Sequence, residues 1–182
     1  MSQISSIKNF ESLCNDMKNG KINNLIILGA NPVYDSPVDF DFAESLKKVK
    51  NSVHLTNIID ETSKLCSWNI AMNHYFECWG DAMTYDGHVS IVQPQIMPLF
   101  DSKSIIQVLS PIVHSKEQSA YDTVKNVWKS NIIKSGNFER EWDKVLHDGL
   151  YKKPIFKKVS VRPASKISTC LLYTSDAADD DR

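Results

Sequence analysis

The first residues that could take part in chemistry follow a short apolar strand near the start of the chain. The segment LIILGANPVYDSP (residues 25–37) passes from that strand into Gly29, Asn31 and Pro32. Ligands commonly bind in the crevice at the carboxyl ends of parallel strands. There, Gly29 would let the backbone approach a ligand, and Asn31 would offer a hydrogen-bond donor and an acceptor. Pro32 fixes the turn, and Asn-Pro is a common turn pair, so the motif predicts either a ligand-binding strand end or an ordinary turn.

A second group of candidate residues lies between residues 74 and 98. On a helix, His74, Glu77 and Asp81 would share one face and could hold a metal ion. Gly80 and the polar composition of this segment favour a loop, in which the same side chains would form hydrogen bonds. We adopt the loop interpretation. The sequence shows no specific Ser/His/Asp order or Cys/His pair, so we predict neither a metal site nor a catalytic residue.

The composition is that of an ordinary globular chain. Of the 182 residues, 42% are apolar and 24% are charged, which suffices for one sizeable domain with a hydrophobic core. The 21 basic and 22 acidic residues nearly balance, which gives no reason to expect a nucleic-acid or anionic-membrane surface. No apolar run approaches the ~20 residues of a membrane span.

The cysteines are too widely spaced for a recognisable cluster site. Iron–sulfur and structural zinc sites usually take closely spaced thiolates, because a short loop wraps several ligands around one centre. The chain has no C-x-x-C pair, so we predict separate, partly buried thiols. The four cysteines are Cys14, Cys66, Cys78 and Cys170.

The order of the predicted elements indicates an α/β fold. A strand that is apolar on both faces, as residues 25–28 are, is typical of a buried parallel strand. Helices alternating with strands predict a parallel sheet flanked by helices. The expected helices lie at residues 7–17, 42–49 and 60–66, and the expected strands at 25–28, 52–56 and 69–72, the last of which could also be irregular.

The second half of the chain is predicted to contain loops and helices. Residues 73–100 are interpreted as a long loop region with one short strand, Val89–Val92. A helix is expected at 102–109, followed by two amphipathic helices that bury Trp128 and Trp142. Gly149 ends the last helix.

We divide the chain into four parts. The tail resembles the translation of a sequencing adapter, so it is excluded from functional reasoning. The parts are an α/β domain at 1–112, its helical extension at 113–150, a linker to a missing domain at 151–168, and a non-native tail at 169–182.

Three stretches resemble the molybdopterin oxidoreductases. They are LIILGANPVYDSP (25–37), VHLTNIIDETSKLCSW (53–68) and HYFECWGDAMTYDGHVSIVQPQIMPLFDSKSIIQVL (74–109). The last is most similar to the iron–sulfur, molybdopterin-oxidoreductase-like large subunit of bacterial alternative complex III, which passes electrons from quinol to cytochrome c or a similar acceptor. The resemblance covers about residues 7–160. It implies an internal fragment with a Rossmann-like domain.

The resemblance also implies positions for a cofactor. In the family, a Gly-x-Asn-Pro strand end contacts one guanine-dinucleotide arm of the molybdenum cofactor, which implies that Gly29, Asn31 and Pro32 face it. The family's Glu-Gly-Arg loop lies nearer the pterin and corresponds to residues 86–94 here, which implies that His88 and Gln93 lie there.

This chain departs from the family pattern in that loop. Asp86 replaces the glutamate and His88 replaces the arginine, and residues 69–76 lack the proline of the family's D-x-V-L-P pattern. The resemblance to alternative complex III members implies that the fold is kept while the molybdenum cofactor is lost. We therefore expect a vestigial site and no cofactor in this fragment, with iron–sulfur clusters elsewhere in the subunit.

The resemblance leads to three functional hypotheses. The first is a scaffold within an electron-transfer subunit, whose partners are the cytochrome c and quinol-binding subunits of a respiratory complex at the periplasmic face of a bacterial inner membrane. The second is an active subunit that binds molybdopterin guanine dinucleotide. The third is a small nucleotide-binding module, although the chain has neither G-x-x-x-x-G-K nor G-x-G-x-x-G. A pocket at the tip of strand 25–28 that is filled by side chains would exclude the second.

Overall fold

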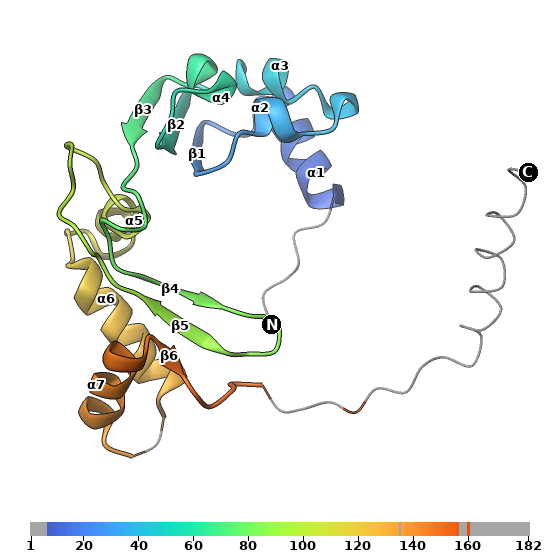
Figure 1. Cartoon of the computed structure of the whole chain (residues 1–182). Helices are drawn as coiled ribbons and strands as arrows, with labels where there is room; N and C mark the ends of the chain where they lie inside the picture. Colours follow the sequence, from blue (N-terminus) through green and yellow to red (C-terminus); the bar gives the residue numbers. More distant parts are fainter. Residues whose placement is uncertain (1–6, 135, 157–159, 161–182) are drawn as a thin grey trace, which may run out of the picture.

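Two sheets, each with its own helices, make up the part of the chain that the structure describes. The computed structural model describes residues 7–134, 136–156 and 160. One sheet is parallel and is formed by strands within residues 24–71, and the other is antiparallel and is formed by strands within residues 80–151 (Figure 1). This arrangement confirms a mixed α/β chain with a parallel sheet flanked by helices.

The parallel sheet has three strands in sequence order. They are β1 (Asn24–Leu28), β2 (Asn51–Thr56) and β3 (Trp68–Ala71). Leu25 lies opposite Ser52, and Val53 lies opposite Trp68. The third strand therefore forms, and the carboxyl ends of all three strands meet at one edge of the sheet, where the predicted strand-end motif lies.

The first hydrophobic core joins this sheet to two helices. Cys14 and Met17 of α1 (Ile7–Lys18) and Leu46 of α3 (Phe42–Leu46) pack with Ile27 of β1, and all four side chains are buried. The predicted apolar stripes of both helices thus form a real core. Burial on one face is what holds such short helices in place, since their intrinsic stability in water is marginal.

Short helices lie at the carboxyl edge of the parallel sheet. Pro32 begins α2 (Pro32–Asp35), because its missing N–H costs nothing at the first helical position. A 3-10 turn, η1 (Val38–Phe40), follows. Asp60 caps α4 (Glu61–Leu65) by accepting a 2.8 Å hydrogen bond from the Ser63 N–H, as predicted for this segment.

The second sheet corrects the prediction of one long loop at residues 73–100. The strands β4 (Gly80–Met83) and β5 (Val89–Val92) form an antiparallel hairpin, and β6 (Leu150–Tyr151) pairs with the other edge of β5. Only β5 was predicted. The β4 sequence GDAM shows no alternation and stays mostly exposed, so only pairing with β5 makes it a strand. Likewise, β6 places Tyr151, the start of the predicted linker, in a sheet.

A proline inside a helix accounts for a second correction. The helix α5 (Ile105–His114) begins with a capping box formed by Ser104 and Gln107, but it continues past Pro111 instead of stopping at residue 109. A proline removes only its own N–H bond, so the turn after it can stay helical. The helix ends at Ser115, which adopts a left-handed conformation.

The second hydrophobic core is built around tryptophans, as predicted. The helix α6 (Ala120–Val127) runs into a π-helical turn, η2 (Trp128–Ile132), and α7 (Phe138–Asp148) ends at Gly149. Trp128 and Trp142 are almost completely buried and meet edge to face at 5.5 Å between ring centroids. They pack against Val89 and Ile91 of β5, so these helices cover the antiparallel sheet.

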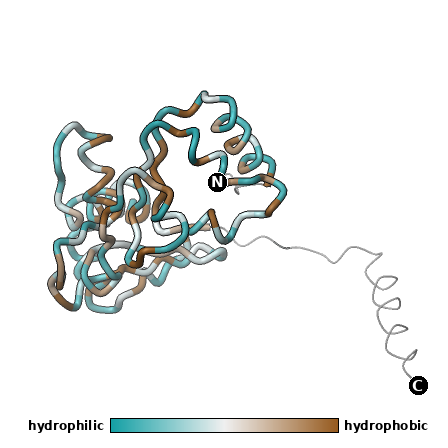
Figure 2. Tube along the Cα trace, turned by 90° about the horizontal axis from the view of Figure 1, so that it is seen from above, coloured by the Kyte–Doolittle hydropathy of each residue, from teal (hydrophilic) through white to brown (hydrophobic). Residues whose placement is uncertain are grey.

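Apolar stretches along the trace are short and are interrupted by polar ones (Figure 2). Within the described ranges, no helix is long and apolar enough to span a bilayer. Cys14, Cys66 and Cys78 are free thiols and at least partly buried, as predicted. Cys170, the tail at 169–182 and most of the linker at 151–168 lie outside the described residues.

Candidate functional site

The tip of β1 forms the predicted strand-end turn. Gly29 adopts a left-handed backbone with φ of +63°, and its N–H donates a 2.8 Å hydrogen bond to the Leu55 carbonyl of β2. A left-handed residue at this point favours glycine. The Met72 side chain lies beside Gly29, 3.6 Å from where a Cβ would be. The turn therefore packs against the residue that follows β3.

Asn31 uses its side chain to connect this turn to α4. Its Oδ1 accepts hydrogen bonds from the Thr62 hydroxyl at 2.7 Å and the Thr62 N–H at 3.3 Å. Its Nδ2 donates to the Glu61 carboxylate at 2.7 Å. The Thr62 hydroxyl also accepts from the Val33 N–H of α2. Both acceptor positions of the amide oxygen are thus occupied by the protein itself.

A buried histidine that the sequence analysis did not single out supports the same edge. The His54 side chain of β2 is completely buried, and its Nε2 lies 2.9 Å from the Ala30 carbonyl. A carbonyl can only accept, so Nε2 carries a proton and donates it to this bond. Nδ1 lies 3.0 Å from the Ser63 hydroxyl and 3.6 Å from the Asp60 carboxylate. The only sign of this histidine in the sequence was its place within an apolar strand. Its hydrogen-bond partners could not be predicted, because they belong to other elements.

Carboxylates dominate the charge at this edge. The hydrogen bond from Asn31 lowers the pKa of Glu61 below its ordinary value, and the nearby Lys64 adds to this effect. Burial raises the pKa of Asp60, but hydrogen bonds from Ser63 and the charge of His54 outweigh it, so that pKa is also lowered. Both groups are therefore ionised at neutral pH, and negative charge at this place opposes the phosphates of a dinucleotide.

The free space beside the β1 tip is small. A hollow of about 230 Å³ is lined by Ala30 and Pro32 together with Phe10 and Asp35. Sites for small molecules typically measure about 300–1,000 Å³. The hollow against Ala30 and Pro32 is therefore smaller than a typical small-molecule site.

His88 lies elsewhere, at the end of the β4–β5 turn. Its Nδ1 is 2.9 Å from an Asp86 carboxylate oxygen, and the Thr84 hydroxyl donates to the other oxygen of that carboxylate. The hydrogen bond from Thr84, and then the one from His88, lower the pKa of Asp86 to about 2. Asp86 and His88 therefore form a local turn network.

Gln93 contacts a third part of the molecule. Its side-chain amide donates a 2.7 Å hydrogen bond to the Leu146 carbonyl of α7, near the end of β5. The described contacts thus bring Gly29, Asn31 and Pro32 together, whereas His88 and Gln93 bond to other elements.

The possible metal trio takes up separate structural roles. Both oxygens of Glu77 accept backbone hydrogen bonds, one from the His74 N–H at 2.8 Å and one from the Leu99 N–H at 3.0 Å. Asp81 lies in β4 and accepts a 2.9 Å hydrogen bond from the Trp128 indole. Within the described part of the chain, no group of three or more His, Cys, Asp or Glu side chains is arranged to hold a metal ion.

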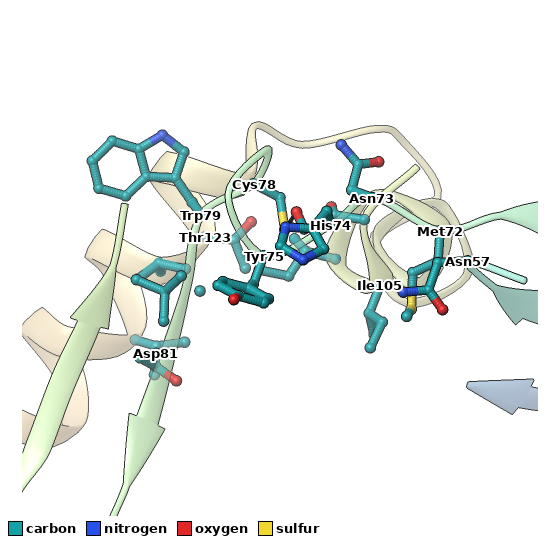
Figure 3. Close-up of a pocket in the computed structure, with 16 residues that line it drawn as sticks. Asn57, Met72, Asn73, His74, Tyr75, Cys78, Trp79, Asp81, Ile105 and Thr123 are labelled. Carbon is teal, nitrogen blue, oxygen red and sulfur yellow. Dashed lines mark hydrogen bonds between the residues drawn. The ribbon is translucent and has the colours of Figure 1, made fainter. Parts of the chain in front are cut away.

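A larger cavity, which the sequence did not predict, lies between the two sheets. It measures about 610 Å³, and we call it the inter-sheet cavity. Figure 3 shows the rings of His74 and Tyr75 between Trp79 and Asp81 on one side and Ile105 on the other. None of the five predicted site residues lines it, but Met72, which lies beside Gly29, does, so the cavity adjoins the strand-end motif without containing its residues.

Comparison with known proteins gives no match, either to a protein family or to a curated protein.

Proposed function

We propose that this chain is part of an electron-transfer subunit of a membrane quinol:acceptor oxidoreductase, in which it acts mainly as a scaffold with a lapsed molybdopterin site. The resemblance of residues 25–37, 53–68 and 74–109 supports the class of protein. A parallel sheet flanked by helices is compatible with the Rossmann-like domain that this class requires. The scaffold would hold cluster-bearing and cytochrome-bearing subunits close together at the outer face of a bacterial inner membrane.

The observation that carries the scaffold role is the engagement of Asn31. Its amide oxygen accepts two hydrogen bonds from Thr62, and its nitrogen donates to Glu61, so the group expected to recognise a guanine holds α4 instead. The small hollow at the strand end and the ionised Glu61 support the same role. Under this proposal no residue described here does acid–base or nucleophilic chemistry.

Metal and pterin analysis of the full-length subunit, purified within its native complex, tests this proposal. We expect iron without molybdenum or tungsten and without a fluorescent pterin oxidation product. Stoichiometric molybdenum or tungsten together with pterin would overturn the scaffold role. It would favour the alternative, an active subunit that binds molybdopterin guanine dinucleotide.

A second measurement addresses the alternative of a small nucleotide-binding module. Equilibrium dialysis of the 182-residue chain against GTP should show no saturable binding, because the sequence offers no glycine-rich phosphate loop. Saturable binding that Asn31→Ala abolishes would contradict the scaffold role and favour the module.

A further inference from the structure

The inter-sheet cavity lies where several elements meet. Asn57 follows β2 and Met72 follows β3, whereas Ile105 begins α5 and Thr123 belongs to α6. Figure 3 shows these side chains around one space. Its volume of about 610 Å³ lies within the range of small-molecule sites. The cavity is therefore large enough to hold a small organic molecule.

The chain between β3 and β4 supplies much of the cavity wall and is held in place by hydrogen bonds. The carboxylate oxygens of Glu77 accept backbone bonds, one from the His74 N–H at 2.8 Å and one from the Leu99 N–H at 3.0 Å. The Cys78 thiol donates to the His74 carbonyl. These bonds set the wall before any ligand arrives, and such preorganisation favours binding.

Asp81 contributes the carboxylate of the lining, and one oxygen of that carboxylate is free. Its Oδ2 accepts a 2.9 Å hydrogen bond from the indole of the buried Trp128, which holds the side chain in place. Its Oδ1 has no hydrogen-bond or ion-pair partner among the described residues, and the residue is exposed. A carboxylate oxygen that lines a cavity and is unpaired can accept a charge-assisted hydrogen bond or face a positive group.

Aromatic rings accompany this carboxylate. Tyr75 is 60% exposed, and Figure 3 shows its ring between Asp81 and His74, whose ring centroid lies 4.0 Å from that of Tyr75. Trp79 also lines the cavity and packs against Tyr121 at 4.9 Å between ring centroids. The face of a tyrosine or tryptophan ring carries negative charge density and attracts a cation. The rings therefore favour a ligand of the same charge as the carboxylate does.

The lining carries a negative charge without a permanent positive one. Within the described part of the chain, no lysine or arginine lines the cavity. Burial, and then the charge of Glu77, raise the pKa of the Cys78 thiol, so this lining residue stays neutral. An anionic ligand would meet the Asp81 carboxylate without a positive partner, whereas a cationic ligand would neutralise it. A metal ion fits poorly, because in the described ranges no group of three or more His, Cys, Asp or Glu side chains could hold one.

The rest of the wall is aliphatic. Such a surface receives hydrocarbon, since contact with it removes apolar area from water. A ligand that combines a positive group with an apolar body therefore matches both parts of the cavity. The aliphatic lining residues are Met72, Val92, Ile105, Ile106, Val124 and Val127.

We propose that the inter-sheet cavity binds a small organic cation, an ammonium group that carries an apolar body. The ammonium group pairs with the free oxygen of Asp81 and lies against the Tyr75 ring, and the apolar body lies against the aliphatic wall. This inference goes beyond the scaffold role and does not depend on it.

Equilibrium dialysis of the full 182-residue chain with benzyltrimethylammonium tests the site. We expect saturable binding of one molecule per chain. Val127→Arg should abolish it, because Val127 lines the cavity and is 42% exposed, so a bulky cation can enter the space without disturbing a buried core. Val113→Arg is the matched control: it adds the same charge, but Val113 is exposed on α5 and does not line the cavity, so binding should be retained.

A second arm tests the role of Asp81 by comparing the cation with neopentylbenzene, its neutral isostere. Asp81→Asn should weaken binding of the cation by about fivefold or more, the effect of one ion pair in contact even at the dielectric constant of water, and leave neopentylbenzene unchanged. The variant should fold, because an amide oxygen can still accept from Trp128. Asp122→Asn is the control, since it removes the same charge from an exposed residue of α6 that does not line the cavity.

A third arm tests the ring of Tyr75. Tyr75→Leu should weaken binding of the cation by about twofold to fivefold, whereas Tyr75→Phe keeps the aromatic face and should leave it unchanged. The Tyr75 hydroxyl makes no hydrogen bond to a described residue, so neither change removes one. Circular dichroism and thermal melting check that every variant folds.

Several outcomes would overturn the proposal. The absence of saturable binding of benzyltrimethylammonium, or undiminished binding by folded Val127→Arg, would exclude the cavity as the site. Equal losses in Asp81→Asn and Asp122→Asn would mean that only the net charge of the chain attracts the cation, and an equal loss of neopentylbenzene would mean that Asp81 shapes the cavity without pairing with a charge. Equal affinities of Tyr75→Leu and Tyr75→Phe would overturn the role of the ring.

Discussion

At the scale of single residues, the polar side chains at the β1 tip satisfy one another. Asn31 bonds to Thr62 and Glu61, and His54 lies between the Ala30 carbonyl and the Ser63 hydroxyl. Buried or half-buried polar groups are stable only when they are paired in this way. Asn31, which the sequence pattern predicts to contact a ligand, and the buried His54 therefore connect β1, β2 and α4 through hydrogen bonds.

Asn31→Ala should lower the free energy of unfolding by about 1–3 kcal/mol, because the buried Thr62 would lose the acceptor of both its N–H and its hydroxyl. Urea denaturation followed by circular dichroism measures the change. Asn126→Ala is the control, since Asn126 is exposed on α6 and should change stability by at most about 0.5 kcal/mol. Unchanged stability of the Asn31 variant would show that the amide is not a structural link.

Asp86 supplies a prediction about pH. Its pKa is lowered from 3.8 to about 2, chiefly by the hydrogen bond from Thr84. A carboxyl group with a lowered pKa in the folded state contributes stability above its unfolded pKa, and that contribution is lost as the pH falls from about 4 through about 2. Thr84→Val should therefore raise the Asp86 pKa toward 3.8.

Carboxyl-carbon NMR shifts of Asp86, recorded against pH, measure this change. Ser130→Ala serves as the control, because the Ser130 hydroxyl bonds only within its own helix, to the carbonyls of Asn126 and Val127. An Asp86 pKa that is the same with and without the Thr84 hydroxyl would contradict the assignment of the cause.

At the scale of elements, the β4–β5 hairpin shows where sequence patterns are weak. Its turn contains Gly87, with φ of +87°, and the Gly87 carbonyl accepts a 2.9 Å hydrogen bond from the Ile155 N–H. A Cβ at Gly87 would lie 2.8 Å from the Phe156 backbone nitrogen. The turn thus anchors the chain that leaves β6, which ties the two ends of the second half together.

Gly87→Ala should destabilise the protein more than Gly136→Ala. Both glycines have φ of +87°, but a Cβ at Gly136 would meet nothing within 4 Å. The Gly136 variant should therefore lower the free energy of unfolding only by the strain of a left-handed alanine, about 1–2 kcal/mol. The Gly87 variant should lower it further, because its Cβ also clashes with Phe156. Thermal and urea unfolding compare the two, and equal costs would mean that the contact with Phe156 contributes nothing.

At the scale of the whole molecule, the two sheets keep separate hydrophobic cores. No buried residue belongs to both, among the residues that the structure describes. The parallel bridge between Met72 and Lys103 lies between the end of β3 and the start of α5. Cores that share few contacts can open independently, so we expect two cooperative units.

Leu46→Ala should speed amide hydrogen exchange in β1 and β2 and leave β5 largely protected. Leu46 is 1% exposed in the first core, and truncation of a buried leucine costs about 2–5 kcal/mol. Val145→Ala, in the second core, is the matched variant and should show the reverse pattern. Equal acceleration of both sheets in either variant would show that the chain unfolds as one unit.

Much of the fold was predictable because its signals are local. The apolar stripes of α1, α6 and α7 and the capping residue Asp60 depend only on neighbours within a few positions. The course of β4 was not predictable, because the exposed sequence GDAM becomes a strand only when β5 offers its edge. The predicted end of α5 at residue 109 was also wrong, because the helix continues beyond Pro111.

The sequence by itself determined the parallel sheet of the first half, the tryptophan core of the second and the turn at Gly29, since hydrophobic periodicity and backbone preferences are encoded locally. Only the tertiary structure decided what the polar residues do. The Asn31 amide bonds to α4, and the Asn73 side-chain oxygen has no hydrogen-bond partner among the residues that the structure describes. The larger cavity is likewise built from segments that lie far apart in the chain. A side chain's hydrogen-bond partners depend on which elements pack together, and that is a property of the whole fold.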